Sequence, residues 1–226
     1  MSGICGSTND AQRRQVARMN SAMVARGPDE DRTYTDYFSG VSLGARRLRV
    51  IGVNGGQQPL TNEDGTVWAV LGGEIDNRAE LRERLLAHGH RFASDVDTEV
   101  LVHLYEEHGA RMVDALEGTY AFALWDARRR ELLVVRDPNG EERLFYTEHG
   151  GELIFASELV ALVAGMGRDP DLDPASVNAF SVFGYAPDPG SVLHGVKQLP
   201  PGHLLRWEYR SRDAGVEPYL GSTCAA

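Results

Sequence analysis

The spacing of apolar residues along this chain predicts helices where the period is about 3.6 residues and strands where it is about 2. Apolar positions three and four residues apart predict helices over residues 11–26, 78–88 and 98–108. Asp173-Pro174 is typical of a helix start, because aspartate caps free backbone N–H groups and proline suits the first turn. A shorter helix is expected over residues 157–164.

Strands are predicted where apolar or β-branched residues alternate or run together between Gly, Asn and Asp. The predicted strands are residues 2–7, 37–43, 47–53, 67–71, 120–125, 131–136, 143–147 and 152–156. The last four form two hairpins, since short turns separate them. Hairpins favour antiparallel sheets covered by helices over a parallel sheet, so the expected fold class is α+β. The segment 165–173 is linker-like, and the chain beyond Asp188 is rich in Pro and Gly.

Composition and charge exclude several classes of function. With 226 residues, 42% of them hydrophobic and 25% charged, the sequence is typical of a soluble globular protein. A formal charge of −10 argues against nucleic acid as a partner. No apolar run is long enough to cross a bilayer, and the first residues lack the features of a signal peptide. We therefore expect no membrane partner and a cytoplasmic location.

Cysteine and histidine spacing indicates neither a disulfide framework nor a metal site. The two cysteines, Cys5 and Cys224, lie near opposite ends, which suits a reducing compartment. Cys5 is expected to be a small core residue. Among the seven histidines only His88 and His90 are closely spaced, and we interpret them as helix-capping and surface residues. We expect no metal and no cofactor.

Eight short motifs follow one another along the chain. They are Met1-Ser2-Gly3-Ile4, Arg26-Gly27-Pro28-Asp29, Arg46-Arg47-Leu48 with Gly56-Gln57-Gln58-Pro59, Gly73-Glu74-Ile75 with Asn77 and Glu80-Leu81-Arg82, Asp97-Thr98-Glu99-Val100, Arg136-Asp137 with Gly140, Phe155-Ala156-Ser157-Glu158, and Phe183-Gly184-Tyr185 with Leu199-Pro200-Pro201-Gly202-His203. Each is weak alone. In this order they resemble the glutamine-hydrolysing domain of the asparagine-synthetase family, a class II glutamine amidotransferase, over about residues 1–205.

The resemblance implies a fold and a domain division. Class II amidotransferases are N-terminal-nucleophile hydrolases, so the expected architecture is a four-layer αββα sandwich of two antiparallel sheets covered by helices. Residues 1–164 would form the amidotransferase-like domain. Residues 165–226 would form a connector toward a synthetase domain, and this sequence contains no such domain and no Ser-Gly-Gly-x-Asp-Ser pyrophosphatase loop.

The resemblance also implies the reacting groups. Ser2 takes the position of the nucleophile that is freed when Met1 is removed, and its own α-amine would act as the base. An α-amine titrates at about pH 7.7–8.0, so a useful fraction is unprotonated at neutral pH. The backbone N–H of Gly73 would donate to the oxyanion. Without the resemblance, Gly73 would be interpreted as an ordinary turn glycine.

Further residues are implied in binding the substrate. Arg47 would pair with the α-carboxylate of glutamine through its planar guanidinium fork. Asp97 would pair with the α-ammonium group, and Val50 and Glu74 would line the pocket. Taken alone, Arg47 is typical of surface charge and Asp97 of a helix N-cap; the ordered motifs favour the binding roles.

Several positions depart from the family pattern around the expected reaction centre. Ser2 replaces the cysteine nucleophile, and a hydroxyl must lose its proton as it attacks, whereas a thiol is partly ionised near neutral pH. Gly72 replaces the oxyanion asparagine, and losing one such donor typically costs about 10²–10³ in rate. Asp95-Val96 replaces Gly-Ser, and Gly52 replaces an aspartate. Together these changes resemble the β-lactam synthetase branch.

Three hypotheses follow. The first is a stand-alone amidotransferase-like domain whose glutaminase activity is weak or lost, acting with a separate amide-forming synthetase. The second is an active N-terminal serine amidase that hydrolyses glutamine or another amide. The third is a module that binds an amino acid without reacting. The expected ligand is glutamine or a similar amino acid, and the sequence leaves a homodimer open.

Overall fold

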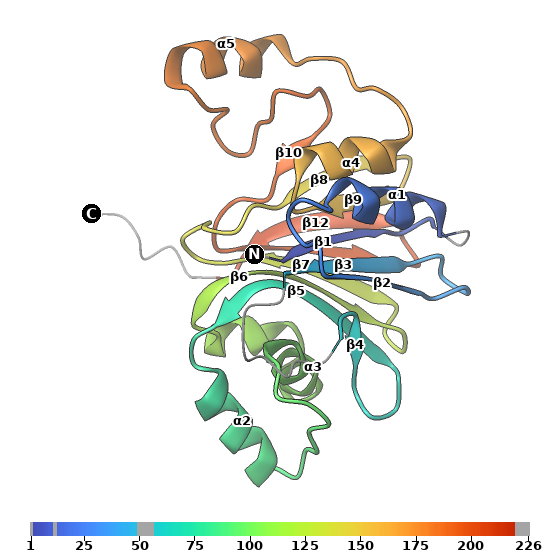
Figure 1. Ribbon diagram of the computed structural model, residues 1–226, viewed down its shortest axis with the longest axis vertical. Coiled ribbons are helices and arrows are strands. Elements are labelled where there is room, and N and C mark those ends of the chain that lie inside the picture. Colours follow the sequence, from blue (N-terminus) through green and yellow to red (C-terminus); the bar gives the residue numbers. More distant parts are fainter. Residues whose placement is uncertain (1, 11–12, 49–56, 220–226) are drawn as a thin grey trace.

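The computed structural model describes residues 2–10, 13–48 and 57–219. Two antiparallel sheets lie face to face, and helices cover both outer faces (Figure 1). The helices α1 (Arg14–Ala22) and α4 (Leu159–Met166) lie on the first sheet. The helices α2 (Arg78–Ala87) and α3 (Asp97–His108) lie on the side of the second sheet. This confirms the expected αββα sandwich.

The first sheet carries the N-terminal strand at its centre. Its order is β10 (Lys197–Gln198), β8 (Phe145–His149), β9 (Glu152–Ala156), β1 (Gly3–Ser7), β3 (Ser42–Arg47) and β2 (Glu30–Thr35). β1 pairs antiparallel with both β3 and β9, with Cys5 opposite Gly44 on one side and Ala156 on the other. The strand that follows Ser2 therefore lies between two neighbouring strands.

The second sheet brings the glycine pair of β5 against β6. Its order is β12 (Asp213–Pro218), β11 (His203–Glu208), β7 (Glu131–Arg136), β6 (Gly118–Asp126), β5 (Val67–Ile75) and β4 (Leu60–Thr61). A short 3₁₀ helix, η1 (Gly109–Ala115), links α3 to β6. α5 (Pro174–Phe183) lies apart from the sandwich (Figure 1).

Three apolar layers separate these elements, and strand alternation fills them. In β1, Ile4 packs between the sheets whereas Cys5 packs under α1. In β5, Val70 packs between the sheets whereas Leu71 packs toward α3. Because successive strand residues point to opposite faces, each buried strand supplies two layers and shows a continuous apolar run. The complete burial of Cys5 confirms it as a core residue.

The structure confirms both predicted hairpins, as β6–β7 and β8–β9, and the predicted helices α2, α3, α4 and α5. Helix α1 is shorter than expected, since it begins at Arg14 and ends at Ala22. The strand predicted over residues 37–43 is wrong except for its last two residues, which begin β3; of the strand predicted over residues 47–53, Arg47 ends β3 and residues 49–53 lie outside the described residues. Residues 37–39 form a turn, whose N–H groups at Phe38 and Ser39 are bonded to the Asp36 carboxylate.

The sequence pattern did not predict β2, the two-residue strands β4 and β10, or the pair β11 and β12. β2 is an edge strand of polar residues, so it has no apolar alternation to detect. The strands β11 and β12 lie in the Pro- and Gly-rich C-terminal stretch, where β11 pairs with β7 and extends the second sheet. The division of the chain at residue 164 stays a prediction. Among the described residues, no helix has the length and apolar character needed to span a membrane.

Candidate active site

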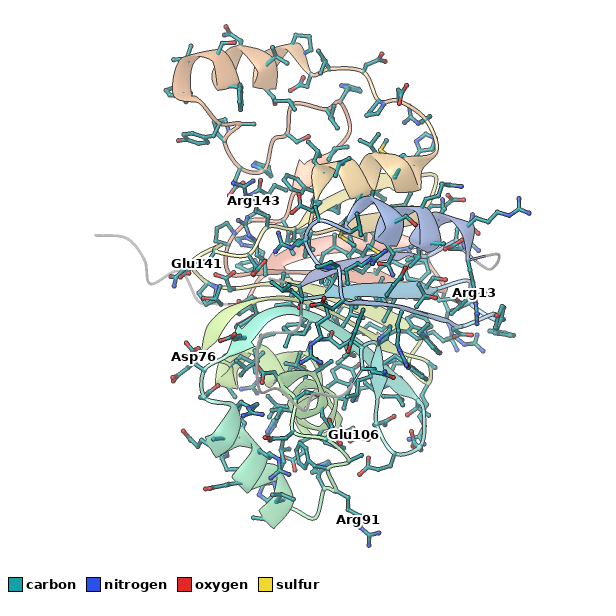
Figure 2. All side chains as sticks on the ribbon, in the orientation of Figure 1. Arg13, Asp76, Arg91, Glu106, Glu141 and Arg143 are labelled. Atoms are coloured by element: carbon teal, nitrogen blue, oxygen red, sulfur yellow. The ribbon has the colours of Figure 1, made fainter. Side chains whose placement is uncertain are left out.

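A cavity of about 460 Å³ opens beside the start of β1, where β5 leads into α2. Its lining brings together five residues expected from the sequence: Ser2, Arg47, Gly73, Glu74 and Asp97. The sixth, Val50, lies outside the described residues, as does Gly52. The other lining residues are Leu48, Gln58, Leu71, Ile75, Asp76, Arg78, Ala79, Asp95, Val96 and Thr98. Figure 2 labels Asp76, which lies in the turn between β5 and α2.

The N-terminal segment is fixed by a buried arginine from the Arg-Gly-Pro-Asp motif. Arg26 donates from Nε to the carbonyl oxygen of Ser2, at 2.7 Å. Its other nitrogens bond to Glu142 and, at 2.9 Å, to Glu158. The side chains of Arg26 and Glu142 are only 12% and 6% exposed. Burial raises the pKa of the Glu142 carboxyl, although the Arg26 charge and hydrogen bond oppose that rise.

The neighbouring motif residues hold the chain on either side of this arginine. The Ser157 hydroxyl accepts the Ile4 N–H at 3.0 Å. At Gly27 a Cβ would lie 2.5 Å from the backbone nitrogen of Arg47, so only glycine allows this close approach. The motifs thus position Ser2 and the end of β3. The sequence identified these motifs but not the role of Arg26.

Two adjacent glycines of β5 meet different surroundings. Gly73 has φ of 95°, and a Cβ there would lie 2.0 Å from the Thr119 carbonyl oxygen, so no other residue fits. At Gly72 a Cβ would lie 3.4 Å from the Ser2 carbonyl oxygen, which is ordinary van der Waals contact. Position 72 therefore lies against the backbone of Ser2, and its surroundings would accept a Cβ.

Asp97 joins the pocket to β5. α3 begins at Asp97, and its carboxylate accepts the Ile75 N–H at 2.8 Å. The residue in the N-cap position is Val96, so Asp97 does not cap the helix, the role that its sequence position alone would indicate. Burial raises the pKa of Asp97, and the nearby Glu74 charge adds to this, while the Ile75 N–H and the Arg78 charge oppose it.

Arg78 is a site residue that the sequence did not indicate. Its Nε lies 3.3 Å from the Asp97 carboxylate, and its Nη1 lies 3.0 Å from the Asp95 carboxylate and donates to the Asp95 carbonyl at 2.6 Å. Asp95 therefore pairs with an arginine, and Val96 is 8% exposed in the pocket wall. An ammonium group arriving at Asp97 would share that carboxylate with Arg78.

Arg47, at the end of β3, lies half-buried on another part of the same lining. Gln58 supports the pocket from the segment before β4, because its side-chain oxygen accepts the Leu71 N–H at 2.6 Å. A guanidinium, a carboxylate and a small nucleophile thus surround one cavity. That arrangement is suited to an α-amino acid whose side chain reaches toward Ser2.

The αββα sandwich, with a pocket at the head of its central N-terminal strand, has the architecture of the N-terminal-nucleophile hydrolase fold. Two solved structures share this fold. Glutamine phosphoribosylpyrophosphate amidotransferase from Bacillus subtilis, complexed with ADP and GMP, matches with a TM-score of 0.65 and 20% identity, over 96% of this chain and 49% of that chain. A structure titled as the allosteric regulatory enzyme of purine biosynthesis matches with a TM-score of 0.66 and 21% identity, with the same coverage.

The model of the glutamine amidotransferase domain family matches residues 1–220, and the chain belongs to that family as a class II domain related to asparagine synthetase. Glutamine-hydrolysing asparagine synthetase 1 of Bacillus subtilis is 37% identical over 84% of this chain and 30% of its own length. Asparagine synthetase 3 of Arabidopsis thaliana is 39% identical over 70% of this chain and 27% of its own length. The chain thus spans about a third of the length of these relatives.

Proposed function

We propose that this domain binds glutamine in the Ser2 pocket, hydrolyses it weakly or not at all, and acts with an amide-forming synthetase carried on a separate polypeptide. The observation that carries the proposal is Gly72, which lies against Ser2 and offers no side-chain donor where the resemblance expects an asparagine. The missing side-chain donor at position 72 and the weaker nucleophile at Ser2 would both slow attack on the side-chain carbonyl of glutamine.

The binding half of the proposal rests on charge. Arg47 and Asp97 line the same cavity as Ser2. A guanidinium matches a carboxylate in two parallel hydrogen bonds, and a carboxylate attracts an ammonium group. We expect isothermal calorimetry to detect glutamine binding, and Arg47→Ala to weaken it by roughly tenfold or more. Equal affinity of the variant would contradict this role for Arg47.

The chemical half rests on the two substitutions at the reaction centre. Removing one side-chain donor from an oxyanion hole typically lowers the rate by about 10²–10³. Serine adds a further cost, because the α-amine must take the hydroxyl proton as the oxygen attacks. The wild-type protein should therefore release little glutamate from glutamine, even with Met1 removed.

The decisive experiment is a glutamine hydrolysis assay on protein whose N-terminus is verified by mass spectrometry. Ser2→Cys and Gly72→Asn are made singly and together, and Gly72→Ala serves as the matched control that adds a Cβ without a donor. We expect the double variant to gain the most and Gly72→Ala to gain nothing. Robust hydrolysis by the wild type would overturn the proposal.

The partner half of the proposal is supported by α5 and the residues after it. Within the described residues α5 buries none of its side chains, and Phe180, Phe183 and Tyr185 are each more than half exposed. Exposed apolar clusters commonly mark protein–protein contacts. A synthetase polypeptide that lacks its own amidotransferase domain should bind the wild type, and Phe180→Ser with Phe183→Ser should weaken that binding.

A second candidate is an active N-terminal serine amidase, favoured by the fact that Ser2 still faces an intact charged pocket. This activity requires a free α-amine, since that amine is the base. Measurable hydrolysis by the wild type that disappears after N-terminal acetylation would favour the amidase. Hydrolysis that survives acetylation would exclude the mechanism.

A further inference from the structure

Away from the Ser2 pocket, histidine and glutamate side chains meet beside α3. Glu63 comes from the β4–β5 loop, His90 follows α2, and His103 lies within α3. Each offers one possible ligand atom, and the three atoms lie within 4.8 Å of one another. Figure 2 labels Glu106 on α3 and Arg91 in the loop after α2, which mark this region.

The histidine at the centre of the cluster is buried with one ring nitrogen unsatisfied. The His103 side chain is 2% exposed, and its Nδ1 lies 3.0 Å from Glu106 and 3.7 Å from Glu63. Its Nε2 has no hydrogen-bond partner among the described residues and lies 3.9 Å from the Glu99 carboxylate. A buried polar atom without a partner costs free energy, so its orientation needs an explanation.

His90 completes the set from the other side. Its side chain is 17% exposed, and its Nδ1 lies 3.6 Å from the same Glu106 oxygen that bonds to His103. The cluster thus places two imidazoles beside the carboxylates of Glu63 and Glu106.

We propose that Glu63, His90 and His103 bind a divalent transition-metal ion of the Zn²⁺ type. Imidazole nitrogens with carboxylate oxygens suit such an ion, whereas Mg²⁺ and Ca²⁺ prefer oxygen ligands alone. Ligand bonds of about 2.0–2.1 Å require the most distant ligand atoms to approach one another by roughly 1.5 Å. Glu63 can make that movement, because its side chain is half exposed.

The metal would set the tautomer of His103. A ring that binds the ion through Nδ1 carries its proton on Nε2, which lies 3.9 Å from the Glu99 carboxylate and would donate to it after a shift of about 1 Å. A carboxylate behind a metal-bound histidine is a common arrangement, and it fixes the tautomer and raises the affinity. Without the ion, the Nδ1 proton bonds to Glu106 and Nε2 is left as a buried acceptor.

The site also reaches the loop that precedes the pocket. The Glu99 carboxylate accepts the backbone N–H groups of Ala93 at 2.6 Å and Ser94 at 2.7 Å. That loop leads directly to Asp95 and Asp97 in the lining of the cavity. Ordering Glu99 through His103 would therefore stabilise the segment that carries Asp97.

The test is calorimetric titration of Zn²⁺, with Mg²⁺ for comparison, into chelator-treated protein without a polyhistidine tag. We expect one Zn²⁺ per chain and little binding of Mg²⁺. His90→Ala and Glu63→Gln should each weaken Zn²⁺ binding by roughly tenfold or more. His149→Ala, an exposed histidine in β8 outside the cluster, should bind as the wild type does.

Both substituted ligands are partly exposed, so these variants should fold even if changes at His103 do not. Zn²⁺ should also raise the melting temperature of the wild type and not that of His90→Ala, since only a bound ion stabilises the folded state. Failure of the wild type to bind Zn²⁺, or equal binding by His90→Ala, would overturn the proposal. Neither result depends on whether the protein hydrolyses glutamine.

Discussion

The two adjacent glycines of β5, Gly72 and Gly73, are constrained very differently by their surroundings. Gly73 is enforced by its backbone, because a Cβ would clash with the Thr119 carbonyl and φ is positive. The surroundings of Gly72 do not require a glycine, because a Cβ at this position would make only ordinary van der Waals contacts. Packing therefore requires glycine at position 73, whereas nothing in the surroundings of position 72 requires glycine there.

The largest loss of folding stability should come from a substitution at Gly73, the glycine that the backbone conformation requires. Gly73→Ala places a Cβ against Thr119 in a left-handed conformation, so we expect a loss of roughly 3 kcal/mol or more of folding stability. Gly72→Ala should change stability by no more than about 1 kcal/mol, because its backbone and surroundings accept a Cβ. Urea unfolding of the two variants measures this difference. Equal stabilities would mean that the two positions are not constrained differently.

A smaller effect is expected at the arginine that holds the N-terminus. Arg26→Ala leaves the buried Glu142 carboxylate without its partner and releases the Ser2 carbonyl, so the expected loss is about 3 kcal/mol. The loss should shrink at low pH, since a protonated Glu142 no longer needs a cation. Arg111→Ala is the control, because its pair with Asp114 is 89% exposed at the arginine and should contribute less than about 1 kcal/mol. Urea unfolding at two pH values distinguishes the variants.

The sequence predicted the residues that line the pocket better than the contacts that hold those residues in place. Ser2, Gly73 and Asp97 were found because their motifs recur in a fixed order, and that order follows from one shared fold. Arg78 was missed because a charged residue in the first turn of a helix is usually solvated, and its contact with Asp97 depends on how β5 turns into α2. Local sequence carries no sign of such a contact.

The same limit applies to the fold and to the histidine cluster. β2 was missed because an edge strand needs few apolar residues, whereas β5 and β6, buried on both faces, show long apolar runs. His90 and His103 come from different elements, and Glu63 lies on a third. Metal-ligand spacing is visible in a sequence only when one or two elements supply the ligands, so this cluster could not be predicted from the spacing of its residues.

The smallest effect concerns Asp97, where binding and stability should change in opposite directions. Its pKa is raised, first by burial, so the folded protein disfavours the charged form relative to the unfolded chain. Above the folded pKa this costs stability, and the cost falls as pH drops through that pKa toward the unfolded value. Asp97→Asn keeps an oxygen for the Ile75 N–H and removes the charge. At neutral pH we expect it to be as stable as the wild type or slightly more so, and to bind glutamine roughly tenfold more weakly. Urea unfolding and calorimetry at neutral pH test both signs, and a variant that is less stable yet binds normally would show that Asp97 serves the fold instead of the ligand.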